Sequence, residues 1–365
     1  MRKYYLDNLR WLIILILFPY HTLLLYTPLG SYIINAGNYL FANIFILSFS
    51  IWFMQLLFAI AGIATFYSLK KRTPKLYIKE RVSKLLIPMI SGVVFVVSVS
   101  VYFGFLYNGY TAGFLTMWWN FITNWFTYFA EGIGLGPLWF LLYLFIISLV
   151  ALPIIMKYKN GEWRIPLEKV TVPKLLLLFI PLAIGNFFLN FYPEKSLVQF
   201  FLLFLFGYFF LSDDGIQEKL EDKRWPLFIS FIGLMSIYLS FYIMNSAGGS
   251  AAPTASNVSL VSILIPSLFT NFILWIGILG IMGMGKHYLE FKNSITLYLS
   301  AASFPIYIFH IAWINILAYY IIGFIPNMIV LQIILIMGIS FVLTILTIEI
   351  VRRIKVIRSI FGIKG

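Results

Sequence analysis

Long, nearly uninterrupted runs of apolar residues dominate this chain of 365 residues. About ten of these runs approach or exceed the roughly 20 residues that an α-helix needs to cross a bilayer. Hydrophobic residues make up 61% of the sequence and charged residues 11%, so a water-soluble fold of this size has too little core to hide them. The runs show no period-two alternation, which argues against a transmembrane β-barrel. The sequence therefore predicts an all-α, polytopic membrane helix bundle.

Ten transmembrane helices are expected from the lengths of the apolar runs. The predicted spans are roughly residues 9–28, 40–68, 86–107, 136–156, 174–191, 196–211, 226–245, 259–284, 295–322 and 327–350. The pair 174–191 and 196–211 fits least well, because the second run is short for a span. The connection 108–135 is too aromatic for a free loop, so we expect an interfacial or re-entrant helix there, with Trp118, Trp119 and Trp125 at headgroup level.

Basic residues are distributed unequally over the connections between these spans. Of the 26 Lys and Arg residues, 25 fall on one side of the expected membrane, and Lys195 is the exception. The positive-inside rule assigns that side, and both termini, to the cytoplasm. The net charge of +13 therefore reflects membrane topology rather than nucleic-acid binding. We expect a multi-pass protein of the cell membrane with one domain over residues 1–365, because no hydrophilic block is long enough for a second.

Two ionisable residues, Arg10 and His21, frame the first apolar run. On an α-helix eleven residues advance about 20° beyond three turns and rise about 16 Å, so both side chains are expected on one face. Arg10 would then lie at the cytoplasmic rim and His21 near mid-bilayer, with Pro19 between them. Ionisable groups inside a membrane are costly and usually functional. The simpler alternatives are a structural hydrogen bond for His21 and a topology anchor for Arg10.

A second intramembrane histidine, His310, lies about 15 residues past the start of its predicted helix, hence about 22 Å from the inner surface. Two histidines at comparable depth on separate helices suit one polar cavity, although a plain helix contact fits His310 nearly as well. The chain has no cysteine, which excludes disulfides and thiolate chemistry. No metal site is predicted, because the three histidines have no acidic partner at ligand spacing.

The connection 68–88 carries seven Lys and Arg residues. Arg81 and Lys84, at i and i+3, are expected on one helical face directly below a span, and Arg72 precedes them. Such a group of cations suits a polyphosphate at the inner mouth of the membrane. Positive-inside topology or binding of anionic lipid explains the same charges without a specific ligand.

These features together resemble the acyltransferase-3 family of membrane acyltransferases. The stretch YYLDNLRWLIILILFPYH (4–21) is similar to the family's opening, an arginine and a histidine separated by ten residues. Three later stretches match further signatures in order: FAIAG (58–62) with the basic loop, GPLWFLLYLFIISL (136–149) and YLSAASFPIYIFH (298–310). The opening and GPLWFL look most similar to the subgroup of glucan biosynthesis protein C. One departure is Arg81-Val-Ser-Lys84 in place of Arg-x-x-Arg, because lysine lacks the planar guanidinium fork.

The resemblance implies an O-acyltransferase that moves an acyl group, acetyl or succinyl, from cytoplasmic acyl-CoA to a saccharide hydroxyl at the outer face. It implies no tightly bound cofactor, since acyl-CoA is the donor substrate. The saccharide, the acyl group and the oligomeric state stay open. The rival function is a transporter of a lipid-linked or small anionic solute, although the inverted repeats common in transporters are absent from the sequence.

Roles for individual residues follow from the same resemblance. His21 would act as general base on the acceptor hydroxyl or would carry the acyl group itself. Arg10 would bind a phosphate or orient the pantetheine arm. His310 would stabilise the oxyanion or hold the tautomer of His21. The phosphates of CoA would meet Arg72, Arg81 and Lys84.

Overall fold

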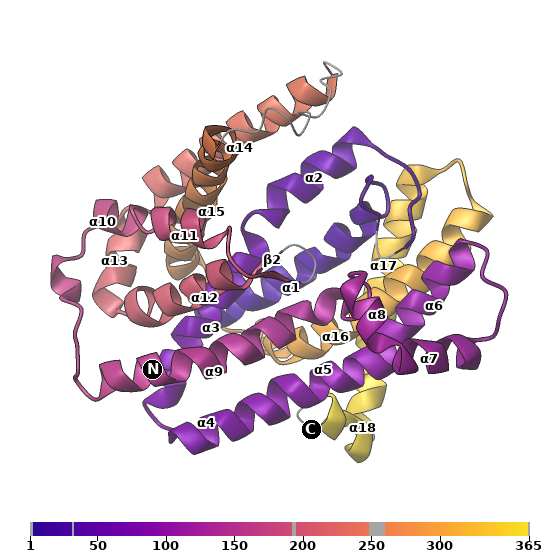
Figure 1. Ribbon diagram of the computed structural model, residues 1–365, viewed down its shortest axis with the longest axis horizontal. Coiled ribbons are helices and arrows are strands. Elements are labelled where there is room, and N and C mark those ends of the chain that lie inside the picture. Colours follow the sequence, from indigo (N-terminus) through magenta and orange to yellow (C-terminus); the bar gives the residue numbers. More distant parts are fainter. Residues whose placement is uncertain (1–2, 31–32, 192–194, 248–259, 364–365) are drawn as a thin grey trace. The chain divides into compact units, whose positions relative to one another are not determined.

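The computed structural model describes residues 3–30, 33–191, 195–247 and 260–363 (Figure 1). Helices account for 81% of the structure, which confirms the all-α prediction. Within the described ranges the only sheet is one antiparallel pair of two-residue strands, β1 (Asn190–Phe191) and β2 (Lys195–Ser196).

The helices follow one another along the described parts of the chain. In the first part of the chain they are α1 (Tyr4–Leu24), α2 (Leu40–Ser50), α3 (Phe53–Leu69), α4 (Pro74–Arg81), α5 (Ile87–Gly92), α6 (Ser98–Tyr107), α7 (Phe114–Thr123), α8 (Trp125–Ala130) and α9 (Trp139–Lys159). They continue with α10 (Val172–Leu176), α11 (Phe179–Gly185), α12 (Leu197–Phe206), α13 (Asp214–Asp222), α14 (Arg224–Ala247), α15 (Leu260–Tyr288), α16 (Ser294–Phe324), α17 (Ile329–Arg353) and α18 (Lys355–Ile360). Three π-helical turns, η1 (Val82–Leu86), η2 (Val93–Val97) and η5 (Gly207–Leu211), and two 3-10 turns, η3 (Gly136–Leu138) and η4 (Leu167–Lys169), interrupt or extend them.

Seven helical stretches of the described chain are long and apolar enough to cross a membrane, and an eighth is added if a bent pair of helices is one span. The seven are Leu40–Leu69, Pro74–Tyr107, Gly136–Lys159, Arg224–Ser246, Ser262–Tyr288, Ser294–Phe324 and Ile329–Arg353. The bent pair is Leu197–Leu211 with Asp214–Asp222, which meet at 95°. A polytopic membrane helix bundle is therefore confirmed, whereas the number ten stays a prediction. Helix α1 is continuous over 21 residues. It is not one of the seven apolar stretches, because its polar residues lower its mean hydropathy.

The prediction of one helix over residues 174–191 was wrong. The chain turns between α10 and α11, leaves the helix after Gly185, and enters β1. Ser196 holds this corner, because its hydroxyl donates to the carbonyl of Gly185 (2.6 Å) and accepts from the backbone N–H of Gln199 (3.1 Å). One side chain thereby ends α11 and caps the start of α12.

A helix does form in the aromatic connection 108–135, as predicted, but as two short pieces, α7 and α8. Trp119 is 64% exposed, and its position at headgroup level stays a prediction. The indole N–H of Trp118 donates to the carbonyl of Val94 in η2 (2.9 Å), and that of Trp125 donates to the carbonyl of Gly134 (3.0 Å). These two tryptophans therefore also fix the segment to its neighbours.

The chain forms two compact units, which are described separately. The first comprises Met1–Leu9, Leu47–Pro74 and Leu149–Lys292, and the second comprises Arg10–Ile46, Lys75–Ser148 and Asn293–Gly365. Within the first unit α14 packs along α15, and within the second α16 packs along α17 (Figure 1).

In the first unit α3 crosses the helix made by α12 and η5 at backbone contact distance. A Cβ atom on Gly62 would lie 2.0 Å from the carbonyl oxygen of Phe204, and one on Gly207 would lie 2.0 Å from that of Ala59. Beside this crossing the ring centroids of Phe58 and Phe200 lie 4.5 Å apart, with the ring planes tilted by 36°. Small residues permit such close approach between membrane helices, which gives a structural reason for the glycine of FAIAG.

The polar connections of the first unit contact one another. The N-terminal segment bonds to α13 through Lys3 and Asp214, and α13 bonds to the end of α15 through Glu221 and His287 (2.9 Å). That hydrogen bond, helped by Lys286, holds the pKa of the Glu221 carboxyl below its usual value. The N-terminal segment, α13 and the end of α15 are therefore linked to one another, while the membrane side on which they lie stays a prediction.

Candidate active site

Within the second unit the structure brings the two predicted intramembrane histidines together. His21 on α1 is 6% exposed and His310 on α16 is fully buried. Their ring centroids lie 5.2 Å apart with the planes tilted by 47°. Phe18, one turn before His21, places its ring edge-on to His310 at 6.0 Å. The two residues that the sequence singled out separately thus form one histidine pair.

A backbone hydrogen bond fixes the tautomer of His310. Its Nδ1 lies 2.9 Å from the carbonyl oxygen of Tyr307, and a carbonyl only accepts, so Nδ1 carries the hydrogen. In the neutral ring Nε2 therefore bears the lone pair and has no N–H to donate. Nε2 is buried and has no hydrogen-bond partner among the described residues. Such an atom in a native core calls for a ligand, a water molecule or a chemical role.

Tyr307 connects His310 to the GPLWFL stretch. Its hydroxyl donates to the carbonyl of Pro137 in η3, and its ring meets Phe140 edge-on at 5.8 Å. Gly136 adopts φ +51°, a conformation that favours glycine. The stretches GPLWFL and YLSAASFPIYIFH are therefore in contact one helical turn before His310. Tyr307 makes this contact, and the sequence did not indicate its role.

Further buried polar atoms in the second unit escaped prediction. Thr22 Oγ1, Asn315 Oδ1 and Thr344 Oγ1 have no partner among the described residues. Thr22 follows His21 directly, and Thr344 lies one turn beyond Phe341, whose ring contacts Phe18 at 5.4 Å. The Nδ2 of Asn315 donates to the hydroxyl of Ser100 on α6 (2.6 Å). The interior of this unit is therefore more polar than its apolar sequence indicates.

Arg10 lies on the same continuous helix as His21. Because α1 is helical from Tyr4 to Leu24, the shared face expected from the spacing is retained, and the two residues are about 16 Å apart along the axis. The side chain of Arg10 is partly buried. Arg10 and His21 are therefore too far apart to act on the same atom of a substrate.

The helical stretch expected to carry Arg81 and Lys84 on one face forms, but a π-turn interrupts its α-helical register. Residues Val82–Leu86 form the π-turn η1, in which hydrogen bonds run to the fifth residue and the turn is wider. The Arg81 guanidinium lies 4.5 Å from the centre of the Tyr77 ring, and Lys84 Nζ pairs with Glu80 (3.2 Å).

The third predicted phosphate ligand, Arg72, belongs to the first unit. Its guanidinium donates to the hydroxyl of Ser68 at the end of α3 (2.6 Å). One of its partners therefore lies at the α3 terminus.

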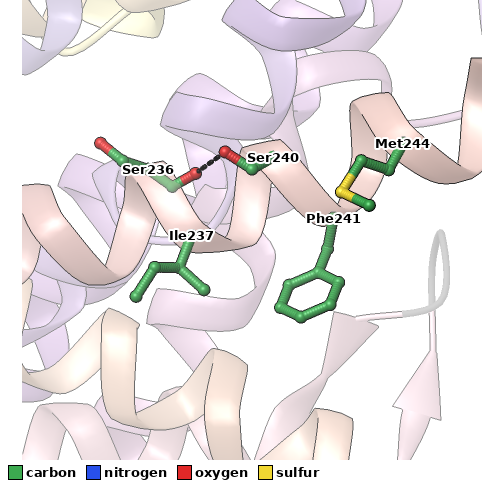
Figure 2. Close-up of a pocket in the computed structure, with 5 residues that line it drawn as sticks. All are labelled: Ser236, Ile237, Ser240, Phe241 and Met244. Atoms are coloured by element: carbon green, nitrogen blue, oxygen red, sulfur yellow. Dashed lines mark hydrogen bonds between the residues drawn. The ribbon is translucent and has the colours of Figure 1, made fainter.

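A hollow of about 260 Å³ lies on the surface of α14, lined by Ser236, Ile237, Ser240, Phe241 and Met244 (Figure 2). Ser240 donates its hydroxyl to the carbonyl of Ser236 (2.8 Å), and Ser236 donates to that of Ile232 (2.9 Å). Both serines are thereby satisfied by their own helix. No titratable side chain lines the hollow, so it offers no acid, base or nucleophile.

The Tyr307→Phe substitution is expected to destabilise the protein by about 1 kcal/mol, the usual net contribution of one buried hydrogen bond. The same change releases the turn that carries His310, so the rate of acyl transfer falls while KM for the donor stays constant. Thermal unfolding in detergent and initial rates measure the two effects.

Tyr26→Phe is the matched control, because Tyr26 also donates one buried hydrogen bond, to Gln332 (2.7 Å). It should lose similar stability and keep the rate. Equal rates for the two variants would show that Tyr307 has no positioning role.

Comparison with known proteins agrees with the geometry. The family model described as an acyltransferase domain, that of the acyltransferase-3 family, matches residues 3–349. No curated protein and no solved structure matches the chain. Because the match covers nearly the whole sequence and the chain holds several apolar helices of membrane-spanning length, the protein belongs to the acyltransferase-3 family and is a membrane acyltransferase.

Proposed function

We propose that the protein transfers an acyl group from cytoplasmic acyl-CoA to a hydroxyl of a saccharide at the outer face of the cell membrane. The observation that carries the proposal is the buried contact between His21 and His310. Buried histidines on two helices are costly to keep inside a membrane without a task. An acyl transfer that needs a base to take the proton of the acceptor hydroxyl supplies such a task.

His21 serves as the general base in this proposal. The acceptor hydroxyl oxygen attacks the thioester carbonyl carbon while its proton moves to a ring nitrogen of His21. The C–S bond then breaks, and the proton passes from His21 to the departing thiolate. The products are the saccharide ester and CoA with a free thiol, and the enzyme returns to its starting state.

The fixed tautomer of His310 favours one of the two roles expected for it. Because its Nδ1 hydrogen is directed to the carbonyl of Tyr307, neutral His310 offers a lone pair and no N–H to an oxyanion. A charged imidazolium at a fully buried position costs several kcal/mol unless it is paired. His310 is therefore proposed to accept a hydrogen bond from a ring N–H of His21, which orients His21 and fixes its tautomer.

The donor's phosphates are proposed to meet cations at the cytoplasmic ends of the helices. Arg10, on the face of α1 that carries His21, is suited to the arm of acyl-CoA below the histidine pair. Arg81 directly precedes the π-turn η1 and Lys84 lies within it, and the side chain of Lys84 is 54% exposed. Lysine acts here as a point charge and not as a bidentate fork.

A glucan or a related surface polysaccharide is proposed as the acceptor, on the similarity of the opening and of GPLWFL to the glucan biosynthesis protein C subgroup. Acetyl and succinyl are the proposed acyl groups. The protein needs no resident cofactor for this chemistry, since the thioester is already activated.

The direct test uses purified protein in lipid nanodiscs with acetyl-CoA or succinyl-CoA and glucan oligosaccharides. The expected result is thiol release that requires the acceptor, together with an acylated oligosaccharide in the mass spectrum. One equivalent of thiol released without acceptor would assign His21 as the acyl carrier. Movement of a solute across proteoliposomes with no thiol release would instead support a transporter and contradict the proposal.

A further inference from the structure

Thr22, the residue after His21, carries a buried hydroxyl that has no hydrogen-bond partner among the described residues. A threonine inside a helix commonly bonds to the backbone of the preceding turn. Thr347 in α17 shows this pattern, since its hydroxyl donates to the carbonyl of Leu343 (2.8 Å). The hydroxyl of Thr22 makes no such bond, although its side chain is 0% exposed. Such a buried donor calls for a partner that the helix itself does not supply.

The turn of α1 that carries Thr22 lies beside the histidine pair. Phe18 and Thr22 are four residues apart on a continuous helix, so their side chains share one face and lie one turn apart. The ring of Phe18 contacts His310 of α16 at 6.0 Å and Phe341 of α17 at 5.4 Å. Thr22 therefore lies on the face of α1 that packs against α16 and α17, about 5 Å along the helix axis from Phe18.

The proposed reaction needs a hydrogen-bond donor at the thioester carbonyl. When the acceptor hydroxyl attacks the carbonyl carbon, negative charge develops on the carbonyl oxygen, and a positioned donor stabilises that charge in the transition state. Neutral His310 does not supply this donor, because its N–H is directed to the carbonyl of Tyr307. Backbone N–H groups inside a helix are already bonded to carbonyls four residues back. The donor is therefore expected among the remaining side chains.

Side-chain donors on α16 within two turns of His310 already have partners in the second unit. The donors and their acceptors are Ser303 with Ser300, Tyr307 with Pro137, Trp313 with Thr347, and Asn315 with Ser100. In the described part of this unit, the buried hydroxyls without a partner are those of Thr22 and Thr344. Thr22 directly follows the proposed base His21, whereas Thr344 lies one turn beyond Phe341 on α17. Thr22 is therefore the donor that the geometry favours.

We propose that the hydroxyl of Thr22 donates a hydrogen bond to the thioester carbonyl oxygen of the acyl donor in the transition state. This inference rests on the proposed function for the identity of the reaction. As the new C–O bond forms, the π pair of the carbonyl moves onto its oxygen, and it returns when the C–S bond breaks. Thr22 keeps its own proton throughout, while the proton of the acceptor travels through His21 to the thiolate. Consecutive side chains on a helix diverge by about 100°, so the base and the oxyanion donor approach the reacting carbonyl from two sides.

The test replaces the hydroxyl of Thr22 by a methyl group of similar size. In nanodiscs with acetyl-CoA and a glucan oligosaccharide, Thr22→Val is expected to lower kcat about 10²- to 10³-fold, the loss typical of one oxyanion donor. KM for acetyl-CoA stays at the wild-type value, because the hydrogen bond is gained in the transition state and not on binding. Thr22→Ser, which keeps the hydroxyl, is expected to restore most of kcat.

Thermal unfolding in detergent separates this role from a structural one. The hydroxyl of Thr22 bonds to no described residue, so its replacement by a methyl group should leave the unfolding midpoint constant or raise it. A lower midpoint in Thr22→Val, with kcat restored when the assay temperature is lowered, would make Thr22 a structural residue and overturn the inference.

Thr344→Val is the matched control, because it also removes a buried hydroxyl without a described partner from the second unit. It should keep the wild-type kcat. Loss of kcat in Thr344→Val with full activity in Thr22→Val would place the donor on α17 and overturn the inference.

Turnover by the wild-type protein separates this inference from the proposed function. If the wild-type protein releases no thiol from acetyl-CoA in the presence of the acceptor, the proposed function fails and the inference fails with it. If the wild-type protein transfers the acetyl group and Thr22→Val transfers it at the same rate, the inference alone fails.

Discussion

His21→Ala is expected to lower kcat for acyl transfer by about 10²- to 10⁴-fold, the range that a positioned general base supplies. KM for acyl-CoA should change little, because His21 acts on the acceptor hydroxyl and not on the donor's phosphates. Initial rates with purified protein in nanodiscs, at equal protein concentration, measure both quantities. The loss of kcat is expected to be large because His21 has no substitute. Among the described residues of α1, no other titratable side chain is in ring contact with His310.

His287→Ala provides the control for this experiment. His287 belongs to the first unit and bonds to Glu221 near the surface, so its removal should leave kcat unchanged. A His21→Ala protein that is folded, normally abundant and as active as wild type would exclude His21 from the chemistry.

Gly62→Ala is expected to be among the most destabilising single substitutions in the first unit. The new methyl group would lie 2.0 Å from the carbonyl oxygen of Phe204 and 2.9 Å from the backbone nitrogen of Tyr208. Both obstacles are backbone atoms, so the helices must separate, and overpacking of this kind costs about 1–3 kcal/mol or more. The expected result is a clear fall in the thermal unfolding midpoint in detergent and in the yield of monodisperse protein.

Gly233→Ala is the matched control in the same unit. No atom lies within 4 Å of a Cβ at this position of α14, and alanine is about 1 kcal/mol better than glycine inside a helix. The midpoint should stay constant or rise. If both variants unfold at the wild-type temperature, the close crossing of α3 with α12 and η5 is not a determinant of stability.

The fold class followed from the length of the apolar runs and from their lack of period-two alternation, because a membrane protein with such runs is a helix bundle. The positions at which the helices are interrupted could not be predicted from hydropathy. Residues 82–86 and 207–211 form π-turns, and hydropathy carries no information on hydrogen-bond register. The hairpin at Asn190–Ser196 depends on Ser196, whose hydroxyl bonds to two carbonyls of the preceding helix end, and a serine at that position has no distinctive pattern in sequence.

The candidate site was partly accessible from sequence. Depth estimates placed His21 and His310 at a similar level, and an intramembrane histidine is conspicuous. Their contact depends on how α1 and α16 pack, which a single sequence does not specify. Tyr307 was missed because a tyrosine in an apolar helix reads as a core residue, and its partner is a carbonyl. One sequence pattern could have indicated a polar interior in the second unit. Gln332, Ser340 and Thr344 of α17 are spaced at multiples of four residues, and all three are buried.

The central claim is that His21 and His310 act as one catalytic unit. A double-mutant cycle of His21→Ala, His310→Ala and the double variant, measured as kcat with saturating donor and acceptor, tests it most directly. Residues that act together are strongly non-additive, so the double variant is expected to be about as slow as the slower single variant. Two losses that simply multiply would show that the histidines act independently, and would contradict the account.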